Sequence, residues 1–149
     1  MLQRGLPLPK LASVLAAALL TAACGSTTAS TTSSPGAGSG KITVNGEAAN
    51  DHGTKDVSGG GSQSVEVDNF YFNPTVFTAH AGDKLTLTLS NESQTAHTFT
   101  ITEQNIDKDL AVGGKVTVTV TFPSSGTVLF FCRFHRSQGM LGGLKVEQT

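Results

Sequence analysis

Three side chains that bind soft metal ions occur close together near the C-terminal end of the chain. They are Cys132, His135 and Met140, in the spacing Cys-x2-His-x4-Met. Thiolate, imidazole and thioether groups form a soft ligand set. Short segments with the pattern of strands precede and follow this stretch, and two strands would fix both ends of the loop between them. The spacing therefore predicts a metal site in a loop that joins two strands.

A fourth ligand has to come from another part of the chain. His97 begins the alternating segment 97–101, so its side chain is expected to share the inward face of Phe99 and Ile101. His80 precedes a turn and lies beside no apolar run. We therefore expect His97 to complete a site of two histidines, one cysteine and a weak axial methionine, which is a ligand set for copper.

Other uses of these residues fit the sequence less well. A lone cysteine is usually a small buried hydrophobic residue, but here a cysteine, a histidine and a methionine occur together. Zinc binds cysteine and histidine, yet structural zinc sites prefer closed sets of these two residue types. A cysteine hydrolase would need a third residue to orient its base, and the sequence offers Cys132 no such partner.

The composition favours one small domain that does not bind nucleic acid. The chain has 149 residues, with 10 Lys and Arg against 11 Asp and Glu, and only 14% of the residues are charged. A nucleic-acid-binding protein would need a basic stripe to neutralise phosphates. Hydrophobic residues make up 38% of the chain, which is enough for one modest core. We expect a monomer.

The N-terminal segment has the pattern of a signal for export. Residues 1–23 contain a basic start, an apolar run and small residues before Cys24. The apolar run of ten residues would rise only about 15 Å as a helix, which is too short to span a bilayer. The sequence before Cys24 resembles the lipobox of bacterial lipoproteins, although Thr21 stands where an aliphatic residue is usual. This predicts a protein anchored to a membrane by a lipid on Cys24, outside the cytoplasm, at the cell surface or in the periplasm.

The segment 24–63 has the composition of a flexible tether. Residues 25–40 are all Gly, Ser, Thr, Ala or Pro, and residues 45–63 are again polar and rich in glycine. Residues 41–44, between these stretches, are interpreted as a possible isolated strand. Such sequence buries little apolar surface and favours disorder. His52 falls in this segment and is interpreted as a solvated histidine. The folded domain is predicted to cover residues 64–149.

The expected domain is built from short strands. Leu85, Leu87 and Leu89 alternate with polar residues, and so do Val116, Val118 and Val120. Residues 103–112 are interpreted as a loop. The pattern gives about seven strands separated by turn residues, without a sustained helical period. We therefore expect an all-β domain, either an antiparallel β-sandwich or a closed barrel.

The domain resembles the cupredoxins of the plastocyanin and pseudoazurin kind. The resemblance covers residues 65–147 and is carried by the motif from Cys132 to Gly142, by the segment Asn91–Phe99 and by the turn 81–83. It implies a Greek-key β-sandwich or barrel that holds one type 1 copper ion. His97, Cys132 and His135 would be the equatorial ligands, and Met140 the axial one. Many members have asparagine after the first histidine, where this chain has Thr98, whose hydroxyl could partly replace it in linking the two ligand loops.

The resemblance also implies a route for electrons. In the family they pass through the exposed edge of the C-terminal histidine, here His135, which lies in an apolar patch expected to include Leu141. Arg133 and Arg136 flank it. These two residues are interpreted either as charges that steer docking to an acidic partner or as solvated loop residues.

These observations lead to a main functional hypothesis and two alternatives. The main one is a lipid-anchored blue copper protein that carries single electrons between redox protein partners and is not itself an enzyme. The first alternative is a protein that stores copper or delivers it for assembly of a larger cuproenzyme. The second is a cupredoxin domain that serves only as a surface interaction module.

Overall fold

The fold consists almost entirely of β-strands. The computed structural model describes residues 40–148; the predicted export signal, Cys24 and the first part of the predicted tether lie outside the described residues. The first six strands are β1 (Gly40–Val44), β2 (Glu47–Asp51), β3 (Thr54–Asp56), β4 (Gly61–Asp68), β5 (Tyr71–Asn73) and β6 (Val76–Ala79). The others are β7 (Lys84–Asn91), β8 (His97–Ile101), β9 (Ile106–Leu110), β10 (Lys115–Thr121), β11 (Thr127–Phe131) and β12 (Leu141–Val146).

Helical structure in residues 40–148 is limited to two short 3₁₀ turns. They are η1 (Thr102–Gln104), which follows β8, and η2 (Arg136–Gln138), which lies in the loop between β11 and β12. No helix in this part of the chain is long and apolar enough to cross a membrane.

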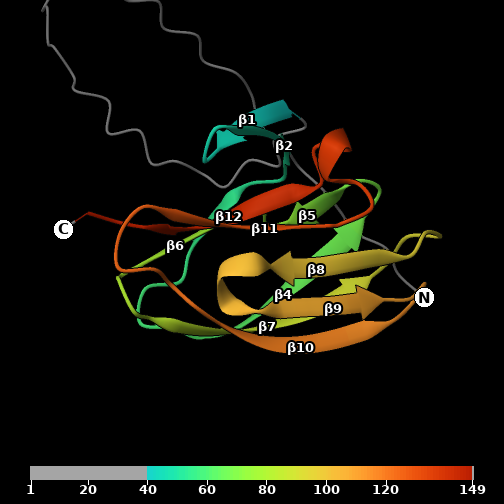
Figure 1. Cartoon of the computed structure of the whole chain (residues 1–149). Helices are drawn as coiled ribbons and strands as arrows, with labels where there is room; N and C mark the ends of the chain where they lie inside the picture. Colours follow the sequence, from blue (N-terminus) through green and yellow to red (C-terminus); the bar gives the residue numbers. More distant parts are fainter. Residues whose placement is uncertain (1–39, 149) are drawn as a thin grey trace, which may run out of the picture. The chain divides into compact units, whose positions relative to one another are not determined.

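Two sheets pack face to face and form the sandwich (Figure 1). One has the strand order β10-β7-β4-β5, and the other has the order β3-β6-β12-β11-β8-β9. The alternating residues of β7 and β10 point inward, where Leu85, Leu87, Leu89 and Val120 are fully buried. The opposite sheet contributes large residues such as Phe99 to the same core. The prediction of an all-β sandwich is confirmed.

The pairing of the strands differs from a purely antiparallel arrangement. β4 pairs with β7, β6 with β12, and β3 with β6, and all three pairs are parallel. These partners are separated by other strands in the sequence, and alternation alone fixes which face of a strand is buried but not which strand lies beside it.

The interpretation of residues 103–112 as a loop is wrong for residues 106–110. β9 lies in this range and pairs with β8 as the outer strand of its sheet. Its sequence is Ile-Asp-Lys-Asp-Leu, and its three central residues are exposed. A strand at the edge of a sheet, with charged residues along its middle, lacks the alternation that identifies half-buried strands.

The prediction that residues 40–63 belong to a flexible tether is also wrong. β1 and β2 form a separate two-stranded antiparallel sheet, which we call the N-terminal hairpin (residues 40–51). Its turn is Asn45-Gly46, and both residues have positive φ angles, 46° and 87°. An Asn-Gly pair with this geometry forms a tight two-residue hairpin turn. The strand interpreted at residues 41–44 is confirmed as β1, whereas the polar composition after the turn obscured β2.

The N-terminal hairpin is held to the sandwich by a second, smaller apolar cluster. Val44 and Ala49 are buried against Val76, Leu129 and Leu141. The hairpin lies against β12, close to the loop that contains η2 (Figure 1). Only a few residues of this cluster belong to the hairpin. The hairpin is therefore buried mainly by residues that lie far away in the sequence.

Candidate metal centre

Three metal-binding atoms converge where β8 begins and β11 ends. The Sγ atom of Cys132 lies 3.8 Å from Nδ1 of His97 and 3.5 Å from Nδ1 of His135. The two Nδ1 atoms are 3.1 Å apart. Within residues 40–148 these are the only His, Cys, Asp or Glu side chains that come together in a group of three. The structure thus brings His97 to the cluster, whereas His80 lies apart and contacts Asp83.

The spacing of these atoms suits a bound metal ion. A triangle with sides of 3.1, 3.5 and 3.8 Å has a central point about 2.0 Å from each corner, and metal–nitrogen and metal–sulfur bonds in proteins are about 2.0 to 2.3 Å long. Cys132 and His97 are almost completely buried, and His135 is half-buried. The three atoms are therefore arranged so that one metal ion could bind all of them.

Met140 is tied to the same residues by its backbone. Its carbonyl oxygen accepts a hydrogen bond from the Cys132 N–H at 3.0 Å, and its own N–H donates to the His135 carbonyl at 3.2 Å. Its side chain is fully buried in the apolar cluster that also contains Cys132. Two imidazoles, a thiolate and a thioether are the donor set of blue copper centres. The residues present thus fit a type 1 copper site.

Ser93 determines which nitrogen of His97 can bind a metal. Its Oγ lies 2.9 Å from Nε2 of His97. The same hydroxyl lies within hydrogen-bond distance of the Asn91 Oδ1 and the Thr95 carbonyl oxygen, which can only accept. The Ser93 proton is therefore used there, and the hydroxyl accepts a hydrogen bond from Nε2–H. This leaves the Nδ1 lone pair of His97 directed at Cys132. Ser93 falls in the segment Asn91–Phe99 that carries the resemblance to cupredoxins, but nothing in its sequence indicated this role.

We expect Ser93→Ala to weaken copper binding about tenfold, because partners of this kind orient a ligand and keep it in one tautomer. Competition with a chelator of known affinity measures the change. Ser64→Ala is a suitable control because Ser64 is exposed on β4. Equal copper affinities of the Ser93→Ala protein and the unchanged protein would contradict this role for Ser93.

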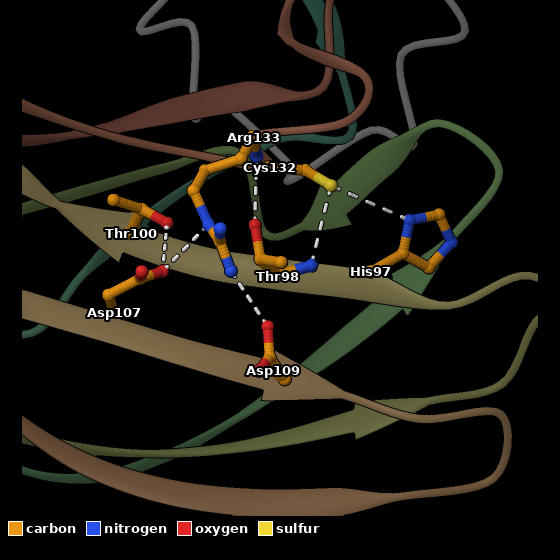
Figure 2. A network of polar contacts seen from close by, with 7 residues as sticks. All are labelled: His97, Thr98, Thr100, Asp107, Asp109, Cys132 and Arg133. Carbon is orange, nitrogen blue, oxygen red and sulfur yellow. Dashed lines mark hydrogen bonds and ion pairs between the residues drawn. The ribbon is translucent and has the colours of Figure 1, made fainter.

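Thr98 links the two segments that carry the ligands. Its hydroxyl accepts a hydrogen bond from the Arg133 N–H at 2.8 Å, and its own N–H donates to Cys132 Sγ at 3.4 Å (Figure 2). The suggestion that the Thr98 hydroxyl takes part in joining the ligand loops agrees with these contacts. A hydrogen bond to the thiolate also stabilises its negative charge and so contributes to the properties of a bound metal.

Arg133 and Arg136 are both paired with carboxylates of this chain. Arg133 lies 3.0 Å from Asp107 and 2.8 Å from Asp109, both on β9 (Figure 2). Arg136 donates two hydrogen bonds to Glu47 of the N-terminal hairpin. Neither interpretation of the two arginines included these partners, because the partners come from segments distant in the sequence. The two arginines instead attach the ligand loop to β9 on one side and to the hairpin on the other.

The exposed rim of the site differs from the predicted patch in one residue. Leu141 is only 1% exposed, because the N-terminal hairpin covers it. Its assignment to an electron-transfer surface is therefore wrong. Phe134 is 56% exposed instead, and the ring of the half-buried Phe70 lies 4.4 Å from the His135 ring. His52 also differs from expectation, since it is half-buried and its ring stacks on Tyr71.

Burial lowers the pKa of both histidines in the metal-free protein. For His97 the main cause is loss of contact with water, and the nearby His135 lowers its pKa further. For His135 burial is the cause. Both imidazoles are therefore protonated less readily than an ordinary histidine, whose pKa is 6.5. The neutral form that this favours is the form that binds a metal.

A pH dependence of stability follows from these lowered pKa values. The unfolded chain takes up protons on these histidines at about pH 6.5, while the folded chain does so only at lower pH. The stability that they contribute is fully present above pH 6.5 and decreases as the pH falls below it. Denaturant unfolding of the metal-free protein between pH 7.5 and 5 measures this decrease. In a protein with both histidines replaced by glutamine, the decrease should be smaller, and an identical pH profile would contradict the assignment.

The fold and the donor set together define a β-sandwich protein with a type 1 copper site. The family model described as Cupredoxin-like domain matches residues 14–142. The chain therefore belongs to the family of cupredoxin-like domains. No protein of curated function matches the chain in sequence.

The chain is also similar to solved structures of low sequence identity. The metal-binding domain of the Cu(I)-exporting P-type ATPase CopA of Streptococcus pneumoniae, solved with Cu(I), has 14% identity and a TM-score of 0.52 over 62% of this chain and 96% of that domain. Auracyanin A, a "blue" copper protein of Chloroflexus aurantiacus, has 22% identity and a TM-score of 0.48 over 60% and 100% of the two chains. A dithionite-reduced auracyanin of Roseiflexus castenholzii has 22% identity and a TM-score of 0.46 over 64% and 97%.

Proposed function

We propose that the protein is a one-electron carrier that uses copper at the site of His97, Cys132, His135 and Met140. The observation that carries the proposal is the arrangement of three donor atoms at 3.1 to 3.8 Å from one another in the metal-free chain. When bound, copper supplies a centre that alternates between two oxidation states one electron apart. A protein frame that does not rearrange between these states keeps the barrier to electron transfer low.

The residues around the site supply this rigid frame. Ser93 orients His97, and Thr98 ties the segment of His97 to that of Cys132. The loop that carries Cys132, His135 and Met140 is closed by its own backbone hydrogen bonds. These contacts link the segments that carry the ligands into one frame, as a carrier requires.

His135 is the ligand through which we propose that electrons enter and leave. It is half-buried, whereas His97 and Cys132 are buried. Phe134, the residue directly before His135, has an exposed ring. An apolar rim of this kind suits brief docking of a redox protein partner. Membrane attachment through a lipid on Cys24, outside the cytoplasm, is part of the proposal and has its basis in the sequence of residues 1–24.

The experiment that tests the proposal is a copper titration of the purified protein. We expect an intense thiolate-to-copper absorption in the visible range and narrow copper hyperfine splitting in the EPR spectrum. Ion binding to the folded state alone stabilises it by about 4 kcal/mol at a free concentration a thousand times the Kd, so the melting temperature should rise. Absence of both the absorption and the stabilisation would refute copper binding.

Two measurements on the copper-loaded protein, the rate of electron exchange and the rate of copper loss to a chelator, distinguish an electron carrier from a copper-delivery protein. A carrier should exchange electrons rapidly between oxidised and reduced molecules while it retains its copper in the presence of a chelator. Rapid loss of copper to the chelator, with slow electron exchange, would support delivery instead.

A further inference from the structure

We propose that the N-terminal hairpin is a positioning element of the copper site and that Asn50 is the residue through which it acts. The proposal rests on the copper-binding function stated above. The hairpin contains none of the four candidate ligands. It nevertheless contacts two segments that border the site, and both contacts are made by Asn50.

Three N–H groups of Asn50 join these segments. Its side-chain amide donates to the carbonyl oxygen of Phe70 at 2.7 Å and to that of Gln138 at 3.0 Å. Its backbone N–H donates to the Gly139 carbonyl at 2.9 Å. Its Oδ1 accepts a hydrogen bond from Lys41 at 2.6 Å, which holds the amide in the orientation that these contacts need.

Each of the two segments held by Asn50 lies next to a candidate ligand. The ring of Phe70 packs against the His135 ring at a centroid distance of 4.4 Å. Gln138 and Gly139 immediately precede Met140, so their position sets where the Met140 side chain begins. Asn50 thus holds Phe70 in place beside His135 and holds the backbone directly before Met140.

The hairpin packs directly against the ligand loop at Gly139. Gly139 has a φ of +88°, and a Cβ atom on it would lie 2.8 Å from Lys41 Nζ and 3.1 Å from Asn50 Oδ1. Glu47 and Arg136 add a second contact from the hairpin to the same loop.

The attachment of the hairpin depends on such contacts because the hairpin belongs to neither sheet of the sandwich. An isolated two-stranded hairpin is at best marginally stable in water. Loss of the Asn50 contacts should therefore loosen the ligand loop and the hairpin together, while the sandwich itself remains folded.

The test compares Asn50→Ala with a matched control. Asn50→Ala removes the three hydrogen bonds of the side-chain amide. Gln104→Ala removes two bonds of the same kind, those between Gln104 and the backbone of Thr121. Gln104 lies in η1, after the end of β8 opposite to His97. The measurements on the copper-loaded proteins are the visible and EPR spectra, the reduction potential and the rate of copper loss to a chelator.

We expect Asn50→Ala to release copper about tenfold faster, in line with the effect of residues that support metal ligands, with a shifted visible band and a shifted potential. Gln104→Ala should retain the spectrum and the release rate even where it lowers the melting temperature. Glu47→Gln weakens only the second contact, so a smaller change in the same direction is expected, and this variant provides the test if Asn50→Ala does not fold.

The outcomes separate this inference from the proposed function. If the unchanged protein shows no copper absorption, the proposed function is wrong. If the unchanged protein is blue, and the folded Asn50→Ala protein has the same spectrum, potential and release rate, the positioning role is overturned. For an Asn50→Ala protein that does not fold, the same result with Glu47→Gln overturns it.

Discussion

Replacing Cys132 by serine is expected to abolish the intense visible absorption of the copper-loaded protein. The absorption arises from charge transfer between a thiolate and copper, and serine offers no thiolate. Cys132 is the only cysteine within residues 40–148 and is fully buried beside both histidines. Visible absorption and EPR after addition of copper measure the result, and copper affinity should fall by at least about a hundredfold because the strongest soft ligand is lost.

His80→Ala is the matched control for this prediction. His80 is exposed, contacts Asp83 and lies outside the cluster, so the copper spectrum should not change. A blue Cys132→Ser protein would show that the thiolate is not a ligand. A blue His97→Ala protein with unchanged affinity would show that His97 is not one, although its Nδ1 lies 3.8 Å from the sulfur.

Gly142→Ala is expected to lower the free energy of unfolding by about 3 kcal/mol. A Cβ atom at this position would lie 2.1 Å from the Thr75 carbonyl oxygen and 2.4 Å from the ring of Phe130. The backbone of Thr75, just before β6, and a fully buried ring cannot move aside cheaply, because the core around them is closely packed. The melting temperature of the metal-free protein should therefore fall by about 10 °C or more.

Gly40→Ala is the matched control for Gly142→Ala. A Cβ at Gly40 would meet no atom within 4 Å, and its φ lies outside the positive range, so the stability should stay nearly constant. If Gly142→Ala proved as stable as the Gly40→Ala protein, the close approach of β12 to β6 would not be a determinant of stability.

The metal-binding residues could be predicted because their chemistry is local in the sequence. Cys132, His135 and Met140 share one loop, and the alternation around His97 indicated that it faces inward. Contacts between distant segments could not be predicted in this way. Arg136 and Glu47 are 89 residues apart, and no pattern in either segment indicates that they pair.

The strands with alternating residues were predicted correctly, whereas those with polar sequence were not. β7 and β10 have a leucine or valine at every second position, and these positions point into the core. β2 and β9 have few apolar residues, and they are strands because they pair with β1 and β8. The supporting residues Ser93 and Asn50 were missed for a related reason, since a single polar residue in a turn or a short strand has no period to reveal it.

The two-residue turn at Asn45-Gly46 and the strands on either side of it have a practical consequence for protein engineering. If a recombinant protein began at Ser64, as the sequence pattern alone would suggest, it would lack Asn50 and Glu47 and would leave Leu141 uncovered. Conversely, residues 40–51 offer a place to adjust the redox behaviour of the centre by substitution while all four copper ligands and the main core stay as they are.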